Sequence, residues 1–163
     1  MSAPGRRLGL DEAAALIGRR DTVLSGLAIG QPVGLLEALG QRQDLEEVVV
    51  FAGLLAWPYA FLQHPGVRTV SGFFGPIERM ARASGARVEY LPADFHGLER
   101  LALRLKPRVV VAATTPPDAD GWLSFGLHAG ATTSAFEEAM RDPARLAIAE
   151  ALAAKQARLA LAV

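Results

Sequence analysis

Short apolar runs of strand length alternate with helix-length segments along most of the chain. The strongest run, residues 109–113, reads Val-Val-Val-Ala-Ala, and residues 48–51 are also rich in β-branched and aromatic side chains. Strands that are buried on both faces read as continuous apolar runs of this kind. The alternation therefore predicts an α/β fold in one domain: an open, mostly parallel sheet flanked by helices, with right-handed crossovers.

The expected elements follow from these runs and from the Gly and Pro residues between them. Strands are predicted at residues 22–27, 45–52, 67–73, 87–91 and 109–113, and helices at residues 10–18, 32–43, 75–84 and 95–105. Pro32 and Pro76 suit the first turn of a helix, and Gly85 suits a helix end. Residues 53–63 are apolar and predict either a loop or a short helix.

The composition is that of one globular domain. The 163 residues are 51% apolar and 21% charged, and seventeen basic residues balance seventeen acidic ones, so no electrostatic attraction to nucleic acid or anionic lipid is expected. The absence of cysteine excludes disulfides, thiolate zinc sites and cysteine nucleophiles. No apolar run reaches the ~20 residues that span a bilayer, and no secretion signal follows Met1. We expect a cytoplasmic protein that binds neither nucleic acid nor membrane.

Ligands of open parallel sheets bind beyond the carboxyl ends of the strands, and three expected strand ends are unusual. At the first, Ser25 and Gly26 lead into a turn with Gly30 and Gln31, and Pro32 begins the next helix. The backbone N–H groups of such a turn can hold a carboxylate, a phosphate or a thioester oxyanion. A plain strand–helix turn accounts for the same glycines. The spacing matches neither the dinucleotide-binding fingerprint nor a Walker motif.

The second strand end is Ser71-Gly72-Phe73. Its two small residues leave room for a ligand, and Phe73 or Phe74 can form the wall of a pocket. A helix start surrounded by core aromatic residues is the alternative interpretation, and taken alone it is the stronger one.

The third strand end is a loop rich in turn-forming residues. Pro116 and Pro117 direct the chain out of the sheet in an extended path. An Asp-Gly turn then predicts that residues 122–125 return as a short hairpin strand. Rigid loops of this kind often carry function. Asp118 and Asp120 are more typical of turn caps than of metal ligands, so no metal site is predicted.

The three histidines do not form a recognisable catalytic set. His64, His96 and His128 are far apart in the sequence and have no neighbours at the spacing of metal ligands. Ordinary surface or capped side chains are the stronger interpretation for each, although His128 follows the third loop and can face a pocket. No Ser-His-Asp set is apparent and Gly-x-Ser-x-Gly does not occur. No catalytic residue is predicted.

The third loop also resembles a known family. Its sequence has the order Pro-Pro-Asp, two residues, Gly-aromatic, one residue, Ser, one residue and Gly, at positions Pro116, Pro117, Asp118, Gly121, Ser124 and Gly126. This order is similar to a pattern of the acetyl-CoA hydrolase/transferase family, which includes acetate and 4-hydroxybutyrate CoA-transferases. Residues 25–32, 71–79 and 87–92 resemble the same family, in the same order. The resemblance covers roughly residues 20–150 and implies that residues 1–163 form an N-terminal CoA-transferase-like domain.

The resemblance implies an enzyme of two related α/β halves that acts on acyl-CoA thioesters. A glutamate carboxylate of such an enzyme attacks the thioester, an acyl-glutamyl anhydride forms, and CoA returns to give a glutamyl-CoA thioester. A small carboxylate then takes the CoA, or water releases it. The family's glutamate lies in the C-terminal half, and none of the ten Glu residues here sits in its motif.

The implied partner is therefore a complementary C-terminal half or subunit that carries the glutamate, within an oligomer. A coenzyme A thioester is the implied substrate, and no cofactor is bound permanently. The first turn, with Ser25, Gly26, Gly30, Gln31 and Pro32, would donate hydrogen bonds to the ligand. The pocket walls would come from Ser71, Gly72, Phe73, Pro116, Pro117, Asp118, Gly121, Ser124 and Gly126.

The last stretch, residues 143–163, allows two structures. Its Ala and Leu content favours a helix, whereas the resemblance implies a strand over residues 145–150. The buried-type run at residues 146–149 favours the strand. The second half of such an enzyme would also cover one face of this domain, so an exposed apolar patch is expected there.

Two other functions compete with the CoA-transferase. One is a non-catalytic module that binds acyl-CoA or carboxylates on the same scaffold. The other is a sugar-phosphate isomerase, which needs an acid/base pair at the strand ends and a phosphate cradle, and neither is evident in the sequence.

Overall fold

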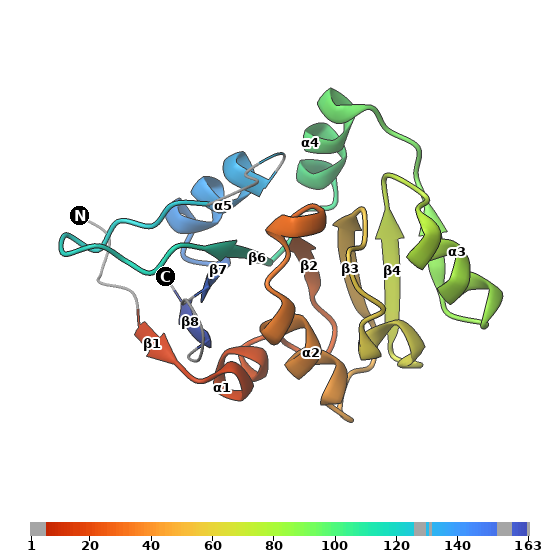
Figure 1. Ribbon diagram of the computed structural model, residues 1–163, viewed down its shortest axis with the longest axis horizontal. Coiled ribbons are helices and arrows are strands. Elements are labelled where there is room, and N and C mark those ends of the chain that lie inside the picture. Colours follow the sequence, from red (N-terminus) through yellow and green to blue (C-terminus); the bar gives the residue numbers. More distant parts are fainter. Residues whose placement is uncertain (1–5, 126–129, 131, 153–157, 163) are drawn as a thin grey trace.

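The structure of the protein, a computed structural model, describes residues 6–125, 130, 132–152 and 158–162 (Figure 1). Its strands are β1 (Arg6–Leu8), β2 (Thr22–Ser25), β3 (Val48–Gly53), β4 (Val67–Ser71), β5 (Val88–Tyr90), β6 (Val109–Thr114), β7 (Leu146–Leu152) and β8 (Arg158–Ala162). Its helices are α1 (Leu10–Ala15), α2 (Val33–Gln41), α3 (Pro76–Ala83), α4 (Phe95–Arg104) and α5 (Thr132–Arg141), with short 3₁₀ helices η1 (Ala28–Gly30) and η2 (Ala60–Gln63).

The described strands form one eight-stranded sheet in the order β1-β8-β7-β6-β2-β3-β4-β5. The six strands from β2 to β7 run parallel, and β8 pairs antiparallel with both β7 and β1. This confirms the predicted open, mostly parallel α/β sheet. All six parallel strands end at the same edge of the sheet, which we call the carboxyl edge.

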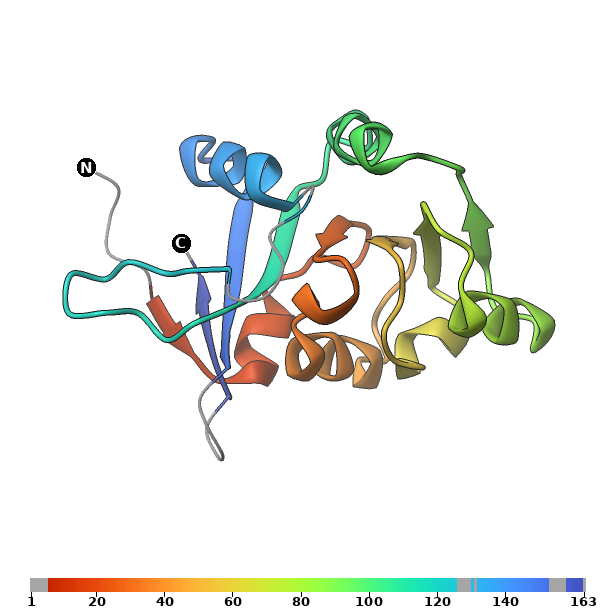
Figure 2. The same ribbon diagram turned by 45° about the horizontal axis from the view of Figure 1, so that its top comes forward.

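Helices cover both faces of the sheet (Figure 2). Strand β6 shows why its sequence is apolar at successive positions. Val109 and Val111 belong to the core that α1, α2 and α3 share with one face, whereas Val110 and Ala112 belong to the core under α4 and α5. A strand that is buried on both faces needs an apolar side chain at every position.

The structure decides between the two predictions for the end of the chain. Residues 146–152 form strand β7, which confirms the strand expected over residues 145–150 and shows the helix prediction to be wrong. Ala147 and Ala149 pack into the core under α4 and α5, while Ile148 packs into the opposite core. Burial against β6 on both faces outweighs the intrinsic helix propensity of alanine. The helix prediction also fails at β8.

Other elements differ from the sequence predictions in detail. Strand β1 and helix α5 were not predicted, and residues 53–63 contain the short helix η2. Residues 122–125 form no strand, so the predicted hairpin strand is wrong. The loop still folds back on itself, because the Thr115 N–H donates a hydrogen bond of 2.8 Å to Ser124 O.

The described helices are too short or too polar to cross a membrane.

Candidate functional site

The carboxyl edge brings the first two predicted strand ends together. Strand β2 ends at Ser25, next to β3, and β4 ends at Ser71 on the other side of β3. The strands are tied at these ends, since the Gly26 N–H donates to Val111 O of β6 at 3.1 Å and the Gly72 N–H donates to Gly53 O of β3 at 2.9 Å. The ends of four adjacent strands therefore share one edge of the sheet, as open parallel sheets require for a binding site.

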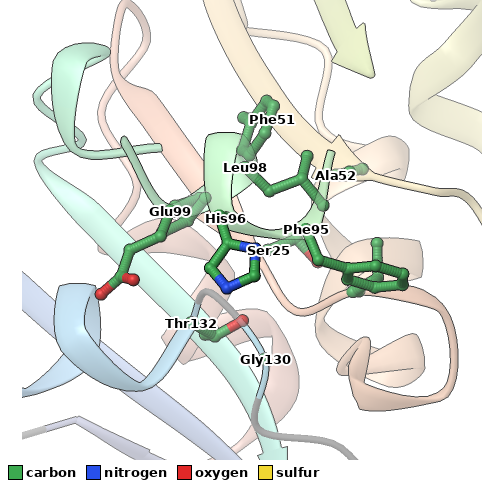
Figure 3. Close-up of a pocket in the computed structure, with 12 residues that line it drawn as sticks. Ser25, Phe51, Ala52, Phe95, His96, Leu98, Glu99, Gly130 and Thr132 are labelled. Atoms are coloured by element: carbon green, nitrogen blue, oxygen red, sulfur yellow. The ribbon is translucent and has the colours of Figure 1, made fainter. Parts of the chain in front are cut away.

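A pocket of about 230 Å³ opens at this edge, between the sheet and helices α4 and α5 (Figure 3). We call it the strand-tip pocket. Its described lining consists of Leu24, Ser25, Leu27, Phe51, Ala52, Gly53, Phe95, His96, Leu98, Glu99, Gly130 and Thr132. The buried apolar residues of the lining come from both the sheet and α4, whereas the polar side chains come from β2, α4 and α5. An apolar hollow with a few convergent polar groups is the usual form of a small-molecule site.

Helix α4 supplies the two polar side chains that the sequence did not single out for this site. Asp94 caps the helix, because its Oδ1 accepts a hydrogen bond of 2.6 Å from the Gly97 N–H. His96 and Glu99 are three residues apart, so they share a face of the helix. His96 had been predicted as an ordinary surface side chain; it is exposed, but it also lines the pocket.

Helix α5 closes the other side of the pocket. Thr132 begins this helix, is almost fully buried and lines the pocket. The hydroxyl of Ser134 donates a hydrogen bond to Oε1 of Glu99, which ties α5 to α4. The pocket wall therefore depends on a contact between two helices that are far apart in the sequence.

The backbone of the first predicted turn is largely engaged within the protein. The N–H groups of Gly26, Gly30 and Gln31 donate to Val111 O at 3.1 Å, Leu27 O at 2.8 Å and Ala28 O at 3.1 Å. Pro32 has no N–H group. These N–H groups are thus not presented to a ligand, because two of them close the turn on itself and the third ties it to β6. The polar group that this turn contributes to the pocket is the Ser25 hydroxyl, which makes only a long hydrogen bond of 3.3 Å to Gly26 O.

Gln31 has a structural role, because its side chain holds the loop after β3. Its side chain is buried, and Nε2 donates to Leu54 O at 3.1 Å. Its Oε1 accepts hydrogen bonds of 3.0 Å from both the Ala56 N–H and the Tyr59 hydroxyl. Gln31 does not line the pocket; it fixes the loop that follows β3.

The second predicted strand end supports the pocket from behind. Ser71 Oγ lies 2.8 Å from Gly53 O and 2.9 Å from Oε1 of the buried Glu78. A Cβ atom on Gly72 would lie 2.1 Å from Leu98 Cδ2, so glycine is what allows α4 to pack here. The ring of Phe73 lies 5.3 Å from that of Phe95. None of Ser71, Gly72 and Phe73 lines the strand-tip pocket, but each contacts or supports residues that do.

The described part of the third predicted loop does not line the strand-tip pocket. Residues 116–125 project past the strands at the β1 and β8 end of the sheet (Figure 2), and none of them lines the pocket, Pro116, Pro117, Gly121 and Ser124 included. Asp118 Oδ1 accepts hydrogen bonds from the N–H groups of Asp120 at 3.0 Å and Trp122 at 2.8 Å, which is the turn cap that the sequence predicted. Gly126 lies outside the described residues. No group of possible metal ligands occurs in the described part of the chain.

The clearest pKa shifts lie at the opposite edge of the sheet. Burial of the Asp21 carboxyl raises its pKa, but hydrogen bonds from Arg108 and the Gly18 N–H, together with the charge of Arg108, lower the pKa by more. The net pKa of Asp21 therefore lies below its usual value. Asp21 precedes β2 and Arg108 precedes β6, so this ion pair joins the starts of two strands and is structural.

Comparison with known proteins shows similarity in structure rather than in sequence. No protein-family model matches the sequence, and no curated protein matches it. RipA from Yersinia pestis has a similar structure, with a TM-score of 0.70 and 22% sequence identity over 79% of this chain and 34% of RipA. A single-residue variant of RipA gives a TM-score of 0.68 with 21% identity, over 79% of this chain and 33% of that chain.

A 4-hydroxybutyrate CoA-transferase from Porphyromonas gingivalis is also similar. Its TM-score is 0.56 and its identity is 22%, over 93% of this chain and 35% of that enzyme. The chain thus spans about a third of the length of these solved structures. The protein has the α/β fold of part of a CoA-transferase, with the strand-tip pocket at the carboxyl edge of its parallel strands.

Proposed function

We propose that this chain is the acyl-binding half of a CoA-transferase or acyl-CoA hydrolase. The observation that carries the proposal is the strand-tip pocket, which opens at the carboxyl edge of a scaffold shared with a 4-hydroxybutyrate CoA-transferase. Ser25 and Thr132 present hydroxyl groups beside an apolar floor of Leu24, Phe51 and Leu98. Such a surface suits the carbonyl end and the hydrocarbon part of an acyl group.

The size of the pocket supports an acyl group rather than a whole coenzyme. An apolar protein cavity of about 150 Å³ holds one benzene molecule, and drug-sized ligands occupy pockets of about 300–1,000 Å³. The 230 Å³ of the strand-tip pocket is therefore large enough for a short acyl chain and too small for a whole coenzyme A. Under this proposal the coenzyme part of the thioester lies outside the pocket and contacts the complementary half.

The rim of the carboxyl edge has apolar side chains that a second lobe would cover. Ile29, Trp57 and Phe95 are 61%, 55% and 67% exposed, which is high for such large apolar groups. They lie on η1, on the loop after β3 and at the start of α4, all beyond the ends of parallel strands. Exposed large apolar side chains that form a continuous patch mark an interaction surface, and these three all follow strands that end at the carboxyl edge. In our proposal the complementary lobe binds here and brings the glutamate to the pocket mouth.

Acyl-CoA turnover tests whether this chain binds the acyl group while a second polypeptide supplies the catalytic glutamate. We expect the isolated chain to release no CoA from acetyl-CoA or butanoyl-CoA, with or without acetate. CoA release or exchange should begin when a second polypeptide that carries the glutamate motif is added, the first choice being the product of an adjacent reading frame. Turnover by this chain alone would contradict the proposal.

A non-catalytic acyl-CoA-binding module would have the same pocket. Calorimetry with acetyl-CoA separates the two functions when it is combined with the turnover assay. Binding without turnover in every combination of chains would favour the module, whereas turnover only in the assembled pair supports the enzyme.

A further inference from the structure

The described lining of the strand-tip pocket contains one carboxylate side chain and neither Lys nor Arg. Glu99 supplies a carboxylate, Ser25 and Thr132 supply hydroxyls, and His96 supplies an imidazole. A ligand that carries a carboxylate inside this pocket would find no Lys or Arg to pair with among these residues.

The carboxylate of Glu99 is fixed rather than free to turn away. Its Oε1 accepts a hydrogen bond from the hydroxyl of Ser134, and the side chain is half-buried between α4 and α5. Figure 3 shows Glu99 extending from α4 toward α5, and His96 and Thr132 line the same pocket. Glu99 takes part in none of the ion pairs of the described residues. Among the described residues, therefore, no Arg or Lys forms an ion pair with its carboxylate.

The apolar floor of the pocket also disfavours a ligand that carries a carboxylate. Leu24, Phe51 and Leu98 are each 2% exposed, so the deepest part of the pocket is apolar. A methyl or methylene group gains free energy from burial there. A carboxylate in the same place loses its hydration without gaining a Lys or Arg partner, and it also lies near another negative charge.

We infer that the strand-tip pocket selects acyl groups without charge over acyl groups that end in a carboxylate, and that Glu99 is a residue that sets this selectivity. The inference rests on the proposed function, since an acyl group has to enter the pocket. It divides the substrates of such an enzyme into two classes, monocarboxylate-derived acyl groups and half-thioesters of dicarboxylates. This chain takes the first class.

Two thioesters of equal size test the inference on the 163-residue chain. S-(4-methylpentanoyl)-N-acetylcysteamine and S-succinyl-N-acetylcysteamine have the same number of non-hydrogen atoms, but only the second carries a carboxylate. Binding is followed near neutral pH by ¹H–¹⁵N NMR, with the amides of Gly53, Leu98 and Thr132 as reporters of the pocket. We expect the uncharged probe to bind about tenfold more tightly than the succinyl probe, as one unpaired like charge nearby requires.

The variant Glu99→Gln removes the charge and keeps an acceptor for Ser134. We expect it to lower the ratio of the succinyl probe's dissociation constant to that of the uncharged probe by about threefold or more, because the succinyl probe binds more tightly. Glu137→Gln is the matched control, because Glu137 is exposed on α5 and does not line the pocket. It should leave the ratio unchanged.

The outcomes separate the inference from the proposed function. Equal affinities for the two probes, or a ratio that Glu99→Gln does not change, would contradict the inference alone. If neither probe shifts the amides of the pocket, the proposed function fails and the inference fails with it.

Discussion

Glu150 Oε2 accepts a hydrogen bond of 2.8 Å from the backbone N–H of Leu35. Its Oε1 accepts a second one, of 3.2 Å, from the N–H of Gly34, so a fully buried carboxylate on β7 caps the start of helix α2. A negative charge is favoured there by the unpaired N–H groups and by the helix dipole. The N–H groups at the start of α2, which follows the first predicted turn, are therefore bound by a carboxylate of the chain itself.

Loss of this cap should destabilise the fold. Glu150→Gln keeps the shape of the side chain, but it replaces one acceptor with a donor and removes the charge. We expect the free energy of unfolding to fall by about 1–3 kcal/mol, measured by urea denaturation. The exposed Glu47 provides the control variant Glu47→Gln, which should stay within about 0.5 kcal/mol of the parent. Equal stability of Glu150→Gln and the parent would show that the cap contributes nothing.

Gly26 should tolerate no side chain. A Cβ atom there would lie 2.1 Å from the backbone oxygen of Gly30, and backbone cannot move aside as a side-chain end can. We expect Gly26→Ala to lower the free energy of unfolding by about 2–4 kcal/mol through distortion of the turn. Gly9→Ala is the control, since its Cβ would make only an ordinary contact of 3.5 Å with Glu12. Similar urea midpoints for the two variants would contradict the predicted clash.

The ion pair of Asp21 with Arg108 should make stability depend on acid pH. Arg108 Nε donates to Asp21 Oδ1 at 2.6 Å, and the pKa of Asp21 is lowered in the folded protein. Its contribution to stability is therefore complete above the unfolded-state pKa of about 3.9 and is lost as the pH falls through the lower folded-state pKa.

Asp21→Asn removes this dependence. We expect it to cost about 1–2 kcal/mol at pH 7 and progressively less below about pH 4, where the parent loses the same interaction. Urea midpoints measured at pH 7, 4 and 3 check the prediction. A difference between parent and variant that stays constant over this range would contradict it.

Ser25 should affect the ligand more than the fold. Its hydroxyl lines the pocket and makes only a long contact of 3.3 Å within the protein. We expect Ser25→Ala to weaken binding of butanoyl-CoA by about five- to tenfold, the usual effect of one lost hydrogen bond. The urea midpoint should change little. Unchanged affinity in calorimetry would remove Ser25 from the binding site.

The sheet could be predicted because the sequence records burial on both faces of each strand. Residues 109–113 and 146–149 are apolar throughout. Such strands have both faces buried when they lie inside a sheet that helices cover on both sides. The strand predicted at residues 22–27 is present for the same reason, but it ends earlier than expected, at Ser25. The carboxyl edge then follows from parallel strand directions alone.

The pocket could not be predicted because its wall is built by tertiary contacts. His96 and Glu99 are separated by one helical turn, and that spacing was the available signal. Thr132 belongs to a helix that the sequence did not reveal, and the Ser134 contact that joins it to α4 spans 35 residues. The hydrogen bond between Leu35 and Glu150 spans 115 residues. No local sequence pattern could therefore predict that a carboxylate of the chain itself caps the helix after the first turn.

The most direct test of this account is the position of an acyl group on the chain. Intermolecular nuclear Overhauser effects with butanoyl-CoA report which protein protons lie near the butanoyl methyl group. The account predicts contacts with the methyl groups of Leu24 and Leu98, on the floor of the strand-tip pocket. Contacts only with residues at the amino ends of the strands, or with residues 116–125, would contradict it.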